Sequence, residues 1–175
     1  AVTFQNAYTR QLGKLELAKA VVGDAKDNGK LPEGAADTKP YTFTITGPAD
    51  VMNYGENGTY KSGTVVFALD KGGLTASATI TITGEGSKTI PGLPTGTYTV
   101  TEDKIGADVE YWELAVTGEG SVDVTNNDTA EITVTNTYTR EVPPVNPPED
   151  QLTTLTITKM VKDSRGGDLT ALAAG

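Results

Sequence analysis

The segment GLPTGTYTVTED at residues 92–103 is the clearest indication of the fold class of this chain. Pro and Gly punctuate its first half, and Thr then alternates with Tyr98, Val100 and Glu102. Alternation with a period of two is typical of a β-strand that has one buried face. Tyr98 and Val100 mark the inward face, and we therefore predict that the Glu102 carboxylate also points inward.

The same alternation occurs along much of the chain, with turn signals between the segments. Thr is the most frequent of the 175 residues and, together with Val, favours strands over helices. The predicted strands are 14–22, 40–47, 59–70, 74–83, 97–103, 109–118 and 130–139. We predict a loop at residues 24–38, and residues 48–54 are compatible with a short helix. About seven strands separated by turns predict an all-β fold, a β-sandwich.

The composition excludes several chemistries. The chain has no Cys and no His, which excludes disulfides, thiolate nucleophiles, Cys/His zinc sites and Ser-His-Asp catalysis. Its formal net charge of -9 is a poor match for nucleic acid or an anionic membrane surface, and no apolar run is long enough to span a membrane. An acidic turn at Asp24, Asp27, Asn28 and Gly29 lacks a suitably placed Glu for Ca²⁺, and we interpret it as a solvated turn. We predict no metal, no cofactor, no nucleic-acid partner and no membrane insertion in this segment.

Two further polar residues share an inward strand face. Lys19 lies on the same face as Leu17, and Asn136 lies on the same face as Val134. An isolated buried Lys or Glu is costly, which suggests that Lys19, Glu102 and Asn136 meet and satisfy each other. Two structural explanations are open: a buried Lys–Glu ion pair with Asn as a hydrogen-bond partner, or placement of these groups at strand ends near solvent.

A third explanation is covalent. Burial lowers the pKa of a Lys, which leaves a neutral amine nucleophile, and it favours a neutral carboxylic acid. The acid can protonate the Asn carbonyl oxygen while the amine attacks the carbonyl carbon, which expels ammonia and leaves an amide crosslink. The candidates for the surrounding low-dielectric wall are the aromatic residues Tyr98, Tyr138, Phe43 and Phe67.

The ends of the chain repeat its interior. FQNAYTR at 4–10 resembles VTNTYTR at 134–140, and KLELAKAVVGD at 14–24 resembles TLTITKMVKD at 154–163. The predicted organisation is the last strand of a preceding repeat at 1–10, one complete domain at 11–140, a Pro-rich linker at 141–151 and the first strand region of a following repeat at 152–175. Asn6 and Lys159 are the equivalents of Asn136 and Lys19 in the incomplete repeats. Neither fragment contains its own copy of the Glu strand, so no crosslink is predicted at either residue within one molecule.

The Lys strand, the phrase KTIPGLPTGTYTVTE at 88–102 and the closing VTNTY strand resemble the Cna B-type repeat domain of Gram-positive surface adhesins and pilins. The resemblance spans about residues 11–140. It implies a transthyretin-like or inverse immunoglobulin-like β-sandwich and an intramolecular Lys–Asn isopeptide bond assisted by an acidic residue. Carried over by position, Lys19 would be the amine, Asn136 the acceptor and Glu102 the catalytic proton shuttle.

The function that this resemblance implies is a structural stalk repeat of a bacterial cell-surface adhesin. Such a protein is extracellular and anchored to the cell wall, with its signal and anchor outside this segment. Its partners would be the neighbouring repeats of the same polypeptide, and a host surface ligand bound through other domains. The alternatives are a sortase-assembled pilin subunit and a ligand-binding adhesin module for a host protein or glycan. No enzyme with turnover is predicted, because the crosslinking is a single autocatalytic event.

Overall fold

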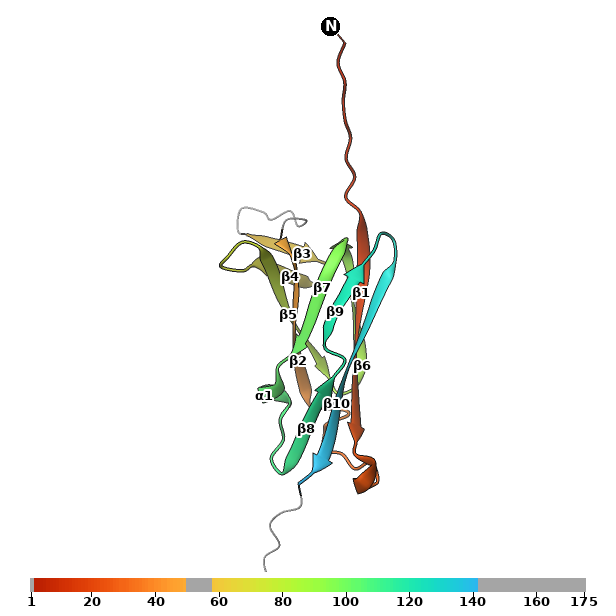
Figure 1. The fold of residues 1–175 in the computed structure, drawn as a ribbon, viewed down its shortest axis with the longest axis vertical. Coiled ribbons are helices and arrows are strands. Elements are labelled where there is room, and N and C mark those ends of the chain that lie inside the picture. Colours follow the sequence, from red (N-terminus) through yellow and green to blue (C-terminus); the bar gives the residue numbers. More distant parts are fainter. Residues whose placement is uncertain (1, 50–57, 142–175) are drawn as a thin grey trace, which may run out of the picture. The chain divides into compact units, whose positions relative to one another are not determined.

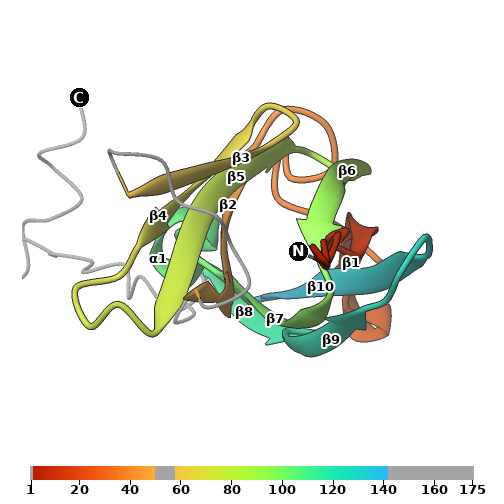
Figure 2. The ribbon, with the colours of Figure 1, turned by 90° about the horizontal axis from the view of Figure 1, so that it is seen from above.

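The computed structural model describes residues 2–49 and 58–141, which form two β-sheets that face each other (Figure 1, Figure 2). The strands are β1 (Leu12–Gly23), β2 (Pro40–Pro48), β3 (Thr59–Ser62), β4 (Val65–Leu69), β5 (Thr75–Thr83), β6 (Gly86–Pro94), β7 (Gly96–Glu102), β8 (Trp112–Thr117), β9 (Gly120–Val124) and β10 (Thr129–Arg140). A 3₁₀ helix, η1 (Ala25–Asp27), follows β1, and the short helix α1 (Lys104–Ala107) follows β7. No helix in the described residues is long and apolar enough to cross a membrane. The predicted all-β sandwich is confirmed.

The first and last strands of the domain are neighbours in the middle of one sheet. This four-stranded sheet has the order β6-β1-β10-β8, and the six-stranded sheet has the order β3-β4-β5-β2-β7-β9. β1 and β10 run parallel, whereas the other paired strands are antiparallel. Because the two strands are parallel, the start of β1 and the end of β10 lie at opposite ends of the sandwich (Figure 1).

Alternation along the strands separates the core from the surface. In β1 and β2, buried positions alternate with more exposed ones along nearly the whole strand. The Thr residues of β2, β7 and β10 occupy the outward positions, and none of them is buried. The largest fully buried side chains come from both sheets: Tyr41, Tyr98, Tyr138, Phe43, Phe67, Leu15, Leu17, Ile45, Ile90, Leu93, Val100 and Val124. The apolar halves of the alternating segments therefore form one common core.

The strand boundaries differ from the predicted ones in two main places. The predicted strand 59–70 is a hairpin, because Gly63 with φ of 61° reverses the chain between β3 and β4. Residues 86–94 form β6, although their Pro and Gly content favours turns. β6 lies at the edge of its sheet, where the missing amide of Pro91 is tolerated. With the short β9, these differences bring the described strands to ten, where about seven were predicted.

Several predictions concern residues outside the described part of the chain. The predicted helix at 48–54 lies mostly there. The same holds for the linker beyond residue 141 and for the following repeat at 152–175, which includes Lys159. These remain predictions.

The acidic turn after β1 holds the end of β10. The Asp24 carboxylate accepts a hydrogen bond from the Thr139 hydroxyl (3.1 Å), and the Asp27 carboxylate accepts one from the Arg140 amide (3.0 Å). The Asp24 amide donates to the Tyr138 carbonyl oxygen (2.9 Å). Within the described residues, no group of three or more His, Cys, Asp or Glu side chains is placed to hold a metal ion. The turn therefore joins the first strand to the last.

Gly47 of β2 leaves room for the fully buried ring of Tyr98. A Cβ at residue 47 would lie 2.4 Å from Cε1 of that ring. We predict that Gly47→Ala lowers the free energy of unfolding by about 1–3 kcal/mol, the usual cost of overpacking a core. Gly72→Ala is the matched control, because a Cβ there meets nothing within 4 Å. Urea denaturation measures both variants, and equal stability of the two would contradict this account of the core.

Candidate functional site

Three strands bring Lys19, Glu102 and Asn136 to one place inside the sandwich. Lys19 lies on β1 opposite Val134, and Asn136 lies on β10 opposite Val21. Lys19 and Asn136 are therefore diagonal neighbours on the inward face of one sheet. Glu102 is the last residue of β7 in the other sheet, and its side chain reaches both of them across the interior.

One carboxylate contacts both of the other groups. Lys19 Nζ donates to Glu102 Oε2 over 3.1 Å, and Asn136 Nδ2 donates to Glu102 Oε1 over 2.7 Å. Nζ also lies 3.5 Å from the Val134 carbonyl oxygen. Each oxygen of Glu102 thus has one partner, so the position of this carboxylate decides where the amine and the amide meet.

The cluster is closed to solvent. Lys19, Glu102 and Asn136 are 3%, 6% and 0% exposed. The explanation that places these groups in solvent at strand ends therefore does not apply. Among the described residues, Asn136 Oδ1 is the buried side-chain atom that lacks a hydrogen-bond partner. Buried polar atoms are nearly always hydrogen-bonded, so this exception needs a reason.

Burial lowers the pKa of the Lys19 ammonium below its ordinary value of 10.5. The largest cause is the loss of hydration inside the protein. The negative charge and the hydrogen bond of Glu102 act in the opposite direction and offset this loss only in part. The Lys19 amine is consequently easier to deprotonate than that of an exposed Lys.

Tyr41 of β2 forms part of the wall around Lys19, in addition to the aromatic residues predicted from the sequence. Its ring centroid lies 4.6 Å from Lys19 Nζ, within the range of a cation–π contact. Its hydroxyl donates to the Ala35 carbonyl oxygen (2.8 Å) and lies 3.4 Å from the Tyr138 hydroxyl, which donates to the Ala107 carbonyl oxygen (2.6 Å). Burial raises the pKa of both phenols, so both remain neutral.

The other predicted wall residues are fully buried in the same core. Phe43 is the register partner of Glu102 on the neighbouring strand β2. Phe67 and Tyr98 form an edge-to-face pair with 6.3 Å between ring centroids, and the Tyr98 hydroxyl donates to the Pro94 carbonyl oxygen (2.9 Å). Tyr98 precedes Glu102 on β7, so this pair packs nearer the start of that strand than the cluster does.

Asn6 is separate from this cluster. Residues 2–10 precede β1 as an extended segment without helix or strand (Figure 1). The side chains of Val2, Phe4 and Tyr8 are 81%, 89% and 91% exposed, and Asn6 is also exposed. The structure therefore does not bring Asn6 to Lys19 or Glu102.

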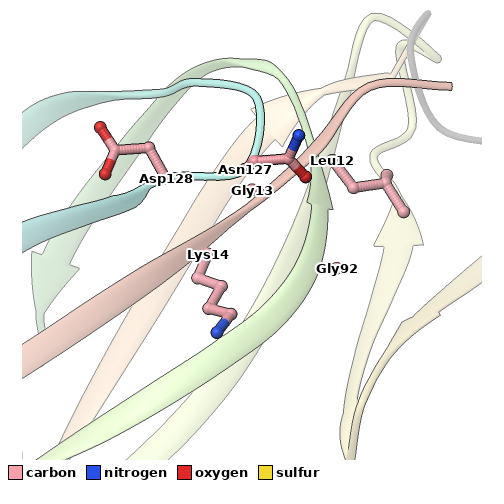
Figure 3. A pocket seen from close by; sticks show the side chains of 6 residues that line it. All are labelled: Leu12, Gly13, Lys14, Gly92, Asn127 and Asp128. Atoms are coloured by element: carbon pink, nitrogen blue, oxygen red, sulfur yellow. The ribbon is translucent and has the colours of Figure 1, made fainter.

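A depression of about 300 Å³ lies where β1 begins (Figure 3). Its lining consists of Leu12, Gly13, Lys14, Gly92, Asn127 and Asp128. The side chains of Lys14 and Asp128 point away from each other (Figure 3). Main-chain hydrogen bonds from Lys14 to Asp128 (2.9 Å) and from Asn127 to Leu12 (2.8 Å) fix its walls. Its polar side chains do not converge on one point, and the lining includes none of the three cluster residues.

The fold and the cluster define a β-sandwich domain with a buried Lys, Glu and Asn that meet at one carboxylate. A protein-family model described as "Domain of unknown function (DUF5979)" matches residues 15–139, from β1 to β10. This match covers most of the chain and includes all three cluster residues, and the chain belongs to that family. A search of the curated proteins finds no match.

Several solved structures of pilus adhesins and pilins are similar to this chain. The pilus-presented adhesin Spy0125 (Cpa) is 24% identical over 74% of this chain and 27% of its own, with a TM-score of 0.40. An adhesin from Mobiluncus mulieris that contains intramolecular disulfide, isopeptide and ester bond cross-links is 20% identical over 73% of this chain and 42% of its own, with a TM-score of 0.38. GBS52, the minor pilin of Streptococcus agalactiae, is 16% identical over 86% of this chain and 49% of its own, with a TM-score of 0.39. This chain thus spans between about a quarter and a half of the length of these proteins.

The lowered pKa of Lys19 predicts how stability depends on pH in a chain that cannot crosslink. In an Asn136→Ala variant, the folded state holds the Lys19 proton less tightly than the unfolded state does. The unfolded chain therefore binds more protons between the lowered pKa and 10.5, and the free energy of unfolding gains a contribution that rises with pH in that window. Below the lowered pKa, the penalty for burying the ammonium is fully present.

Chemical denaturation at a series of alkaline pH values measures this effect. A second variant that also carries Lys19→Met has no amine to titrate, so its profile should lack the rise. Superimposable pH profiles of the two variants would contradict the lowered pKa.

Proposed function

We propose that this chain is a structural stalk repeat of a bacterial cell-surface adhesin, in which Lys19 and Asn136 join in an autocatalytic isopeptide bond with Glu102 as the proton shuttle. The observation that carries the proposal is the buried cluster, in which one carboxylate lies within hydrogen-bond distance of an amine and an amide. A buried ion pair alone is weak support for stability. A crosslink uses all three groups and removes the buried charges. The resemblance of residues 11–140 to Cna B-type repeats supports the same interpretation.

The reaction begins with a proton shift from Lys19 Nζ to Glu102 Oε2, which the lowered pKa of Lys19 favours. The neutral amine attacks Cγ of Asn136 while Glu102 protonates the carbonyl oxygen. Glu102 then carries a proton from the attacking nitrogen to the departing one. The Cγ–Nδ2 bond breaks, ammonia leaves, and the proton on the oxygen returns to Glu102 as the carbonyl group re-forms. One carbon–nitrogen bond forms and one breaks, no oxidant is needed, and Glu102 ends protonated beside an uncharged amide.

The orientation of the Asn136 amide matters for this step. In the orientation described, Nδ2 donates to Glu102 Oε1 and Oδ1 has no partner. Rotation of the amide by half a turn exchanges the two atoms, which places Oδ1 at the position 2.7 Å from Oε1. A protonated Glu102 donates to it there and polarises the carbonyl group. The unpaired oxygen in the ionic state thus finds its partner in the reactive state.

The wall around the cluster favours the uncharged state of the reacting groups. Tyr41 covers Lys19 with its ring, and its hydroxyl is already bonded to the Ala35 carbonyl oxygen. Without water, the interactions between charges and dipoles in the site strengthen. Holding the amine and the amide in place replaces a slow bimolecular aminolysis with an intramolecular one.

The crosslink would change how tension passes through the domain. Lys19 and Asn136 lie on the adjacent, parallel strands β1 and β10, through which the chain enters and leaves. With the bond formed, tension would pass from residue 19 directly to residue 136, and the intervening strands would carry none. The bond would also close a loop of about 118 residues, worth about 5 kcal/mol in the chain-entropy model for crosslinks.

The organisation of the chain fits a tandem array. In this proposal residues 1–10 are the last strand of a preceding repeat, 141–151 are the linker and 152–175 begin the next repeat. The exposed apolar residues Val2, Phe4 and Tyr8 correspond to the inward positions of β10, which supports this assignment. The partners are neighbouring repeats of the same polypeptide, with a host ligand bound elsewhere, and the location is the outer cell surface with an anchor in the cell wall.

A sortase-assembled pilin subunit is the alternative function, and a ligand-binding adhesin module is a further one. A pilin requires a bond between copies through a surface Lys, whereas a stalk repeat requires only the internal bond. Covalent ladders on a denaturing gel of surface extracts would support the pilin. Neither alternative makes the chain an enzyme with turnover.

The intact mass of the purified chain tests the proposed bond. We predict a mass lower than the sequence mass by that of one ammonia molecule. Glu102→Gln, which keeps the shape of the side chain but cannot shuttle the proton, should retain the full sequence mass and melt at a lower temperature. Glu113→Ala, which removes an exposed carboxylate on β8, is the matched control and should lose ammonia normally.

Two results would contradict the proposal. The first is a folded wild-type chain with the unmodified sequence mass. The second is a Glu102→Gln chain that loses ammonia as completely as wild type, which would remove Glu102 from its assigned role while leaving the bond itself in place.

A further inference from the structure

Two Gly-Glu-Gly turns in the sandwich share sequence and backbone conformation. One is Gly84-Glu85-Gly86 between β5 and β6, and the other is Gly118-Glu119-Gly120 between β8 and β9. The first Gly has φ of 63° in one turn and 82° in the other, and the last Gly has φ of 155° and 146°. Each turn thus needs Gly on both sides of its Glu. The side chains of Glu85 and Glu119 take no part in the bond and proton transfers of the proposed reaction.

Glu119 binds the main chain of the residue that carries the acid. The ladder between β7 and β9 ends where Val100 pairs with Gly120. The amide of Glu102 lies beyond that end, and Glu119 Oε1 accepts its hydrogen at 2.7 Å. The Glu119 carboxylate therefore takes the place of the missing strand and fixes the end of β7, from which the Glu102 side chain extends.

Glu85 makes the same contact beside the amine. The ladder between β1 and β6 ends where Lys19 pairs with Gly86. The amide of Val21 lies beyond that end, and Glu85 Oε1 accepts its hydrogen at 3.0 Å. Val21 is also the register partner of Asn136 on the other edge of β1. Glu85 therefore fixes β1 at Val21, which follows Lys19 on the strand and lies opposite Asn136.

Glu119 is itself held in place. Lys104 Nζ, from the first residue of α1, lies 2.8 Å from Glu119 Oε2. Burial alone would raise the pKa of Glu119, but the hydrogen bonds from Lys104 and from the Glu102 amide keep that pKa below its usual range. Glu119 is therefore ionised, and its charged oxygen makes a stronger hydrogen bond to the Glu102 amide than a neutral acceptor would.

We propose that Glu119 and Glu85 are positioning residues for the crosslinking reaction, each holding the amide at the end of a ladder so that the acid and the amine meet the Asn136 amide. This inference rests on the proposed function. Neither residue contacts the reacting atoms. Both act on the backbone of a strand whose side chain does, and a small displacement of a reacting group costs much of an intramolecular rate.

The rate of ammonia loss tests each residue through a pair of variants. The full chain is made by cell-free synthesis, quenched in acid at intervals and weighed intact. We expect Glu119→Ala and Glu85→Ala to slow the reaction at least about tenfold, because the end of the strand is no longer fixed. Glu119→Gln and Glu85→Gln keep an oxygen that accepts the amide hydrogen, although a neutral one, and should react clearly faster than the matching Ala variants. In Glu119→Gln, the ammonium of Lys104 would face the amide nitrogen of the new Gln, and both are hydrogen-bond donors. The exposed Lys104 side chain can turn to solvent and avoid this contact.

The melting temperatures of the same variants in the non-reactive Asn136→Ala background separate positioning from loss of fold. All should be well folded at the assay temperature, with Glu113→Ala as the exposed-carboxylate control in both measurements. The inference is overturned for a residue whose Ala variant reacts as fast as wild type, or whose Gln variant is as slow as its Ala variant. A wild-type chain that loses no ammonia would instead refute the proposed function, so the two failures are distinguishable.

Discussion

The carboxylate of Glu102 is shared, inside a β-sandwich, by the Lys19 amine from β1 and the Asn136 amide from β10. Isolated polar groups would be costly in this core, and the three groups are tolerated because each faces another. The sharing also constrains the fold. β7 must end where Glu102 reaches across to the opposite sheet, and β1 and β10 must pair in the register that places Lys19 diagonally from Asn136. The surrounding aromatic residues exclude water from this contact.

The parallel pairing of β1 and β10 would link the proposed reaction to a mechanical function. Strands that are far apart in the sequence become neighbours, and the reacting side chains come from the strands through which the chain enters and leaves. The acidic turn after β1 also holds the end of β10, because the carboxylates of Asp24 and Asp27 accept hydrogen bonds from Thr139 and Arg140. With a covalent bond between Lys19 and Asn136, tension would pass directly from β1 to β10 and would bypass the other strands of the sandwich. That property suits a repeat in a stalk on a cell surface.

Much of the fold and the central cluster follow from strand alternation alone. Lys19, Glu102 and Asn136 stand out because each occupies an apolar position in an alternating strand, and the opposite faces of β7 and β10 are rich in Thr. The hairpin at Gly63 and the strand β6 were not predicted, because turn residues at a sheet edge look like loop residues in a sequence. Tyr41 alternates with Phe43 and Ile45, and this signal was sufficient to place it inward. Its approach to Lys19 depends on the facing of the two sheets, which a single sequence does not reveal. The roles of Glu85 and Glu119 depend on where two ladders end, and that is also a property of the assembled sheets.

Peptide mapping by tandem mass spectrometry would both detect the bond between Lys19 and Asn136 and locate it in the chain. Trypsin does not cleave after a Lys whose amine is bound in an amide. We therefore predict a branched peptide in which residues 15–26 are joined through Lys19 to Asn136 of residues 105–140. Separate peptides ending at Lys19 and containing an unmodified Asn136, from a chain that was folded before digestion, would contradict it.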